Sequence, residues 1–150
     1  MAEPALYLES SALVKLVLEE HESPALIEFL PAFPRRFSSA LCAIEVPRAV
    51  RRALPGEAAQ QRAQEVLLGL ELVAINEPLI AAASRLLPDT LRSLDAIHLA
   101  TALAFGPELA GMVVYDQRLR DAARAAGITI HSPAGITVAR IPAGGGGELR

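Results

Sequence analysis

The stretch from Leu6 to Leu16 places one carboxylate, Glu9, between a short apolar run and two serines. The apolar run at residues 5–8 fits a buried strand, and Ser10 or Ser11 is suited to cap a following helix. In open α/β sheets, ligands bind at the carboxyl ends of the strands, where loops converge and helix N-termini point. We therefore expect Glu9 to lie at such an edge, where further acids would complete a metal site.

Strand-like and helix-like segments alternate along the rest of the chain. Further strands are predicted at residues 36–39, 71–75, 112–115 and 128–130, and helices at residues 10–20, 25–30, 41–54, 57–70, 77–87, 94–105 and 117–126. Strands separated by helices predict a central, mostly parallel sheet with helices on both faces, which is a three-layer α/β/α fold.

Three residues in these segments carry local structural signals. Ser93 is a suitable N-cap for the helix that begins at residue 94, and Gly127 is suited to the C′ position after the last helix. Pro47 interrupts the predicted helix at residues 41–54, so that helix either starts near Glu45 or kinks there.

The composition predicts one folded domain. Of the 150 residues, 52% are hydrophobic, so we expect a single domain at residues 1–141 and a flexible Gly-rich tail at residues 142–150. The one cysteine, Cys42, excludes an internal disulfide, and no spacing of Cys and His is typical of a zinc site. The sequence has neither a secretory signal pattern nor a run of 18 apolar residues, so we expect a cytoplasmic protein that does not associate with membranes.

The net charge of −3 argues against a protein that coats nucleic acid, because such proteins neutralise many phosphates with a basic surface. It is compatible with an enzyme that holds RNA with a few arginines beside a bound metal ion.

Four acids lie where one type of element gives way to another. Glu9 and Asp116 follow predicted strands, and Glu45 and Asp95 lie early in predicted helices. Acids gathered at one sheet edge repel one another unless a cation binds, and Mg²⁺ and Mn²⁺ prefer oxygen ligands. Such an ion activates water and stabilises charge on a phosphoryl group. Taken singly, each acid also has an ordinary explanation as a solvated residue or as a favourable charge at a helix N-terminus.

Four segments, in this order, resemble the PIN domain family and, more narrowly, its VapC-type toxins. The resemblance covers about residues 5–133 and rests on Leu6–Lys15, Ser39–Glu45, Leu94–Ala102 and Val114–Asp116. It implies a Mg²⁺- or Mn²⁺-dependent endoribonuclease, the toxin of a type II toxin–antitoxin pair. In such an enzyme the metal would be held, and catalysis carried, by Glu9, Glu45, Asp95 and Asp116, with support from Ser11. It also implies a homodimer, an RNA substrate and a small antitoxin whose C-terminal segment blocks the acidic site.

Glu9 departs from the aspartate that is usual in the family. Its longer side chain projects the carboxylate further and holds it less firmly, whereas Mg²⁺ demands near-ideal octahedral geometry. The alternative function is therefore a PIN-like module that binds RNA or a partner protein with weak or no catalysis. A metal-dependent DNA nuclease is a third possibility.

Arginines near the acids are candidates for binding RNA phosphates. Arg48 and Arg52 follow Glu45 by three and seven residues, so a helix places them along one side with it. Arg118 is a further candidate, and so are Arg35, Arg36 and Arg120. Ion pairs with Glu45 or with surface acids are the ordinary alternative.

His98 lies one turn after Asp95 on the same predicted helix face. We favour a packing role, because its neighbours Ile97, Leu99 and Ala100 are apolar. The alternative is a proton carrier at the acidic site, since the unperturbed pKa of histidine is about 6.5.

Overall fold

The computed structural model, which describes residues 3–135, has one central sheet of five parallel strands. The strands lie in the order β3-β2-β1-β4-β5 and span β1 (Ala5–Leu8), β2 (Arg35–Ser39), β3 (Glu71–Val73), β4 (Leu109–Val113) and β5 (Ile130–His131). β2 and β3 lie on one side of β1, and β4 and β5, which come later in the sequence, lie on its other side. The point where the strand order reverses, which is the usual ligand position in such sheets, therefore lies at the carboxyl end of β1.

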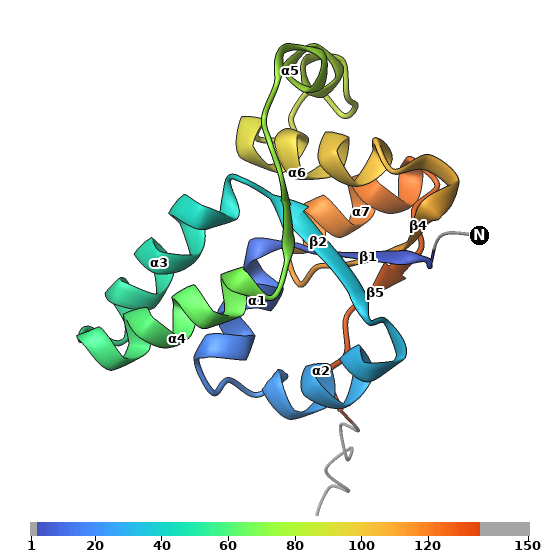
Figure 1. Cartoon of the computed structure of the whole chain (residues 1–150). Coiled ribbons are helices and arrows are strands. Elements are labelled where there is room, and N and C mark those ends of the chain that lie inside the picture. The colour runs from blue at the N-terminus through green and yellow to red at the C-terminus, as the bar shows by residue number, and fades with distance from the viewer. Residues whose placement is uncertain (1–2, 136–150) are drawn as a thin grey trace, which may run out of the picture.

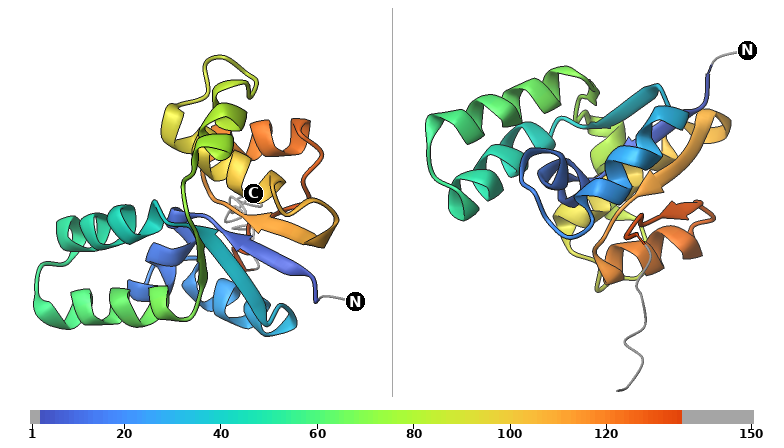
Figure 2. Two further views of the ribbon diagram at one scale, coloured as in Figure 1. Left: turned by 45° about the horizontal axis from the view of Figure 1, so that its top comes forward. Right: turned by 90° about the horizontal axis from the view of Figure 1, so that it is seen from below.

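Helices cover both faces of this sheet (Figures 1 and 2). One face is covered by α1 (Ser10–Val17), α2 (Ser23–Phe29), α3 (Cys42–Ala53) and α4 (Glu57–Leu68). The other face is covered by α6 (Ser93–Leu103) and α7 (Gln117–Ala125), with α5 (Glu77–Ser84) packed on α6. Two short 3₁₀ helices, η1 (Leu30–Ala32) and η2 (Gly106–Glu108), precede β2 and β4. The predicted three-layer α/β/α fold is confirmed.

The central strand β1 contributes to the cores on both faces. Leu6 and Leu8 pack with α1, α3 and α4, whereas Ala5 and Tyr7 pack with α6 and α7. All four side chains are fully buried, which explains why β1 reads as an uninterrupted apolar run rather than as an alternating one.

The helix α3 begins at Cys42 and contains Pro47 in its interior. Of the two alternatives for this helix, the start near Glu45 is therefore wrong. Proline cannot donate the backbone hydrogen bond that the preceding turn would receive. The Pro47 carbonyl accepts a bond from Gln60 Nε2 at 2.9 Å, which ties α3 to α4. Gly56, with a φ of +132° that disfavours other residues, closes the turn between these two helices.

The cap predicted at Ser93 is wrong. Ser93 is the first residue of α6, and the N-cap residue Arg92 makes no side-chain capping bond. Gly127, with a φ of +87°, follows the C-cap of α7, as predicted. Other element boundaries differ from the predicted ones: α1 ends at Val17, α5 at Ser84 and α6 at Leu103, while β4 and β5 span 109–113 and 130–131.

The predicted tail at residues 142–150 and the last residues assigned to the domain, 136–141, lie outside the described residues. Within residues 3–135, no helix is long and apolar enough to cross a membrane.

Two leucines test the assignment of the core. Leu13 on α1 is fully buried, whereas Leu68 at the end of α4 is 85% exposed. We expect Leu13→Ala to lower the free energy of unfolding by about 2–5 kcal/mol, because it removes buried methyl groups and leaves a cavity. The chemically identical change Leu68→Ala should stay within about 0.5 kcal/mol of wild type. Urea denaturation of both variants measures this, and equal losses would contradict the packing of α1 described here.

Candidate active site

A cavity lined by acids lies at the carboxyl ends of β1 and β4. Glu9 directly follows β1, Asp116 is the N-cap of α7 after β4, and Glu45 and Asp95 lie in the first turns of α3 and α6. We call this the acidic cavity, which is lined by Glu9, Ser11, Glu45, Arg92, Ser93, Leu94, Asp95 and Asp116. The structure therefore brings together the four acids singled out in the sequence, and Ser11 with them.

Glu9 caps α1 with its own side chain. Its Oε2 accepts hydrogen bonds from the backbone N of Ser11, at 2.9 Å, and from the Ser11 hydroxyl. The expected cap by Ser10 or Ser11 is therefore wrong, because Glu9 is the N-cap residue and Ser11 is the donor. Ser11 Oγ in turn accepts a bond from the backbone N of Tyr115, at 3.3 Å. One hydroxyl thus links the segment after β1 to the segment after β4.

Asp116 and Asp95 lie on either side of an exposed arginine. Asp116 Oδ1 accepts a bond from the backbone N of Leu119 at 2.9 Å, which caps α7. Arg92 lies 3.3 Å from Asp95 Oδ2, measured from Nε, and 3.7 Å from Asp116 Oδ2, measured from a terminal nitrogen. Arg92 is the one cationic side chain among the described residues lining the acidic cavity, and about two thirds of it is exposed. Such a pair contributes little to stability.

One oxygen of Glu45 is held by two buried neighbours. Oε1 accepts a hydrogen bond from the Ser10 hydroxyl at 2.7 Å and lies 2.6 Å from His98 Nε2. Burial by itself raises the pKa of Glu45, but the bonds and charge from His98 and Ser10 outweigh burial and leave this pKa below its ordinary value. Glu45 is therefore ionised at neutral pH.

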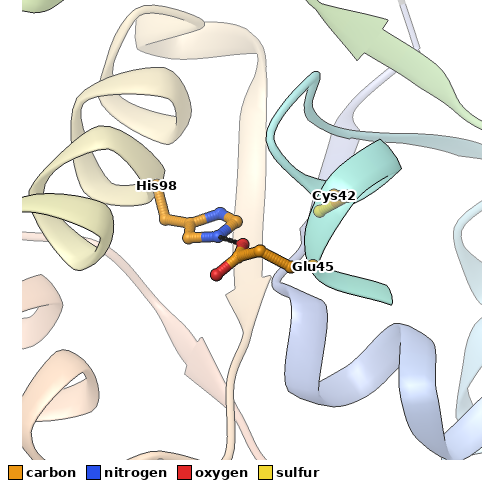
Figure 3. Close-up of side chains that lie close together, drawn as sticks. All are labelled: Cys42, Glu45 and His98. Atoms are coloured by element: carbon orange, nitrogen blue, oxygen red, sulfur yellow. Dashed lines mark hydrogen bonds and ion pairs between the residues drawn. The ribbon is translucent and has the colours of Figure 1, made fainter. Parts of the chain in front are cut away.

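Cys42, Glu45 and His98 offer ligand atoms that lie within 4.8 Å of one another. Figure 3 shows the His98 ring on α6 pointing at the Glu45 carboxylate on α3, with Cys42 earlier on α3. Burial raises the pKa of the Cys42 thiol to about 11, so the thiol is protonated at neutral pH. Its Sγ lies 3.1 Å from Ser10 Oγ and 2.8 Å from Ser38 Oγ. A soft metal needs the thiolate, so this group is better described as a hydrogen-bonded network than as a metal site.

The acidic cavity fits a hard divalent cation better than this network does. Its possible ligands are carboxylate oxygens from four separate segments, the donor type that Mg²⁺ and Mn²⁺ prefer. Burial raises the pKa of Glu9, and the charge of Glu45 adds to this, while the His98 imidazole and the Ser11 bonds oppose it. A cation in the cavity would stabilise the ionised form of Glu9, which burial and the charge of Glu45 disfavour.

A groove with three arginines adjoins the acidic cavity. This arginine groove is lined by Ser10, Ser11, Val14, Leu41, Ile44, Glu45, Arg48, Ala49, Arg51, Arg52 and Leu94. It shares Ser11, Glu45 and Leu94 with the acidic cavity. Arg48 and Arg52 therefore lie on the side of α3 that carries Glu45, as the spacing predicted.

The other candidate arginines lie elsewhere. Arg118 lines a separate hollow with Leu87 and Asp121. Three more are engaged away from the acidic cavity: Arg35 pairs with Glu71 and Glu108, Arg36 donates to backbone carbonyls of Leu30 and Phe33, and Arg120 contacts Gln117 and Ser132.

Sequence reasoning underestimated His98 and missed Arg92 and Ser10. His98 is fully buried and its two ring nitrogens contact Tyr7 and Glu45, so it is a packing residue that also touches the acid set. Arg92 precedes Asp95 by three residues, and that spacing was an available signal. The Ser10 contact spans 35 residues of sequence, and no local pattern points to it.

Comparison with known sequences identifies the family. The PIN domain family matches residues 6–125. Ribonuclease VapC46 of Mycobacterium tuberculosis is 43% identical over 129 residues, which covers 86% of this chain and 98% of that protein. Ribonuclease VapC47 of the same species is 38% identical over 136 residues, with 87% and 98% coverage.

Solved structures show the same fold at lower identity. The M. tuberculosis toxin VapC20, described as cleaving the sarcin-ricin loop, has a TM-score of 0.66 and 16% identity, covering 83% of this chain and 96% of that one. A toxin–antitoxin complex from Klebsiella pneumoniae has a TM-score of 0.63 and 21% identity, with 88% and 99% coverage. The chain therefore belongs to the PIN domain family, among relatives named ribonuclease VapC.

Proposed function

We propose that the protein is a Mg²⁺- or Mn²⁺-dependent endoribonuclease and the toxin of a type II toxin–antitoxin pair, acting in the cytoplasm. The observation that carries this proposal is the convergence of four carboxylates, from four separate segments, on one cavity at the carboxyl ends of β1 and β4. The names of its relatives, ribonuclease VapC, support an RNA substrate.

The residues proposed to hold the cation and carry catalysis are Glu9, Glu45, Asp95 and Asp116. A divalent cation bound there supplies Lewis acidity toward a phosphodiester and activates water for attack. The protein contributes position: Ser11 holds Glu9, and the cap on α7 holds Asp116. Because these acids lie on separate packed elements, they are placed before any ligand arrives.

The arginine groove is proposed to hold the RNA backbone. Arg48 and Arg52 line it together with Glu45, so a phosphate bound there lies next to the acidic cavity. Arg118, in its separate hollow, is proposed as an outlying contact. Single-stranded or looped RNA is the expected substrate, because its bases and backbone are accessible.

The expected partners are a small antitoxin and a second copy of the chain. The arginine groove combines exposed apolar side chains, Ile44 at 61% and Leu94 at 50% exposure, with three arginines. An antitoxin segment lying in this groove would run into the acidic cavity and could place a basic side chain among the acids. The K. pneumoniae structure that shares this fold is a toxin–antitoxin complex, which supports an antitoxin as partner.

The variant Asp116→Asn tests the acidic cavity. Asparagine keeps the cap on α7 but removes the charge, so the fold should persist. We expect wild-type protein with Mn²⁺ to cleave RNA, chelator to stop cleavage, and Asp116→Asn to be slower by at least about 100-fold. Asp89→Asn, an exposed site outside the cavity, is the matched control and should cleave normally. Cleavage that survives chelation, or cleavage of DNA in place of RNA, would contradict the proposal.

The alternative is a module that binds RNA or a protein without turnover, and the departure at Glu9 motivates it. We expect both wild type and Glu9→Asp to cleave, because two hydrogen bonds from Ser11 hold the longer Glu9 side chain. Chelator-sensitive cleavage rates with Mg²⁺ and with Mn²⁺ measure this. The binding module would be favoured if Glu9→Asp cleaved and wild type did not.

The double variant Arg48→Ala, Arg52→Ala tests the arginine groove. In the presence of chelator, its affinity for single-stranded RNA should fall, and the slope of log K against log salt should shrink by about 1.4, as expected for two lost phosphate contacts. The pair Arg62→Ala, Arg124→Ala changes the net charge equally at exposed sites outside the groove. Fluorescence anisotropy across a salt series compares them, and equal losses from both pairs would refute a specific role for the groove.

A further inference from the structure

A series of close polar contacts between buried side chains lies behind the acidic cavity, and we call it the polar network. From Glu45 it runs one way to His98 and Tyr7, and the other way to Ser10 and Cys42. It then continues from Cys42 to Ser38, whose hydroxyl donates to the Leu8 carbonyl at 2.6 Å. Apart from Glu45, no residue of this polar network lines the acidic cavity.

Two hydrogen-bond donors, His98 Nε2 and Ser10 Oγ, face Glu45. The Tyr7 hydroxyl lies within hydrogen-bond distance of His98 Nδ1 and therefore holds the other side of the ring. Since the carboxylate of Glu45 can only accept, His98 Nε2 must carry the hydrogen of their 2.6 Å contact. Ser10 donates to the same oxygen, Oε1. Both donors therefore hold one oxygen of Glu45, and Oε2 receives no hydrogen bond from the described residues.

We propose that His98 and Tyr7 are positioning residues that fix the Glu45 carboxylate so that Oε2 is presented to a divalent cation in the acidic cavity. The inference rests on the proposed function, because it assigns Glu45 to that cation. It adds two residues from the opposite face of the sheet, Tyr7 on β1 and His98 on α6, to the machinery of the site. Carboxylate ligands are commonly oriented in this way by partners behind them.

A purely structural role predicts a different arrangement. Buried polar groups need partners, and an apolar pair of similar shape would serve the core equally well. Instead, His98 and Ser10 both direct a hydrogen at one oxygen of Glu45. Because Ser10 directly follows Glu9, its bond also ties Glu45 to the segment that carries the first acid.

Tyr7→Phe is the most direct test, because it removes one hydroxyl and keeps the aromatic packing against Phe37. Titration calorimetry with Mn²⁺ should show binding about 10-fold weaker than wild type, at the lower end of the effect of such partners. Excess Mn²⁺ should restore the cleavage rate. The control Thr101→Val also removes a fully buried hydroxyl from this region, one that bonds only the Ile97 carbonyl. It should bind Mn²⁺ as wild type does.

Variants of His98 separate orientation from packing. Glutamine can place an N–H donor near the position of Nε2, whereas leucine cannot, so His98→Gln should bind Mn²⁺ more tightly than His98→Leu. If His98→Leu does not fold, the Tyr7→Phe comparison still decides. Unchanged Mn²⁺ affinity in Tyr7→Phe, with wild type binding normally, would overturn this inference alone. A wild-type protein that binds no Mn²⁺ would overturn the proposed function and the inference together.

Discussion

Mutual repulsion among four carboxylates is the constraint on which this site depends. Two unit charges 4 Å apart repel by about 4 kcal/mol at the effective dielectric typical of a protein surface. The chain resists this by placing each acid on a different packed element: the end of β1, the first turns of α3 and α6, and the cap of α7. The backbone positions of these acids cannot move apart without disturbing the cores on both faces of the sheet. The pKa of Glu9 is raised chiefly by burial, and the charge of Glu45 adds to this.

The central sheet supplies the rigidity that this arrangement needs. β1 is flanked by β2 and β4, and its side chains are buried on both faces. The Ser11 hydroxyl bridges Glu9 and the backbone of Tyr115, so the ends of β1 and β4 hold a fixed relation. The single lysine, Lys15, adds a second tie: it bonds Glu20 and Glu22 at 2.7 and 2.9 Å and lies 4.7 Å from the centre of the Tyr115 ring. The segment before Asp116 is thereby packed against α1.

The order of the elements and the identity of the acids could be predicted because their signals are local. An acid directly after an apolar run, as at Glu9 and Asp116, indicates a strand end whatever the rest of the chain does. The contacts between Glu45, Ser10, His98 and Tyr7 could not be predicted, because they join positions 35 to 91 residues apart and depend on how α3 and α6 meet β1. The cap residue of α1 was predicted wrongly for a related reason. Serine is the better cap by propensity, but Glu9 reached the free backbone N–H of α1 itself.

The glutamate at position 9 is compatible with a defined site because its extra methylene is absorbed by the cap. A free glutamate would have one more rotatable bond than an aspartate, and its carboxylate would be less firmly placed. Here Oε2 is held by the backbone and hydroxyl of Ser11, which removes most of that freedom. Oε1 receives no bond from the described residues, and the side chain lines the acidic cavity. Glu9 and Glu45 therefore follow one pattern: one oxygen is fixed by the protein, and the other receives no hydrogen bond from the described residues. Hydrogen bonds therefore fix the positions of both carboxylates, although a glutamate side chain is longer and has one more rotatable bond than an aspartate side chain.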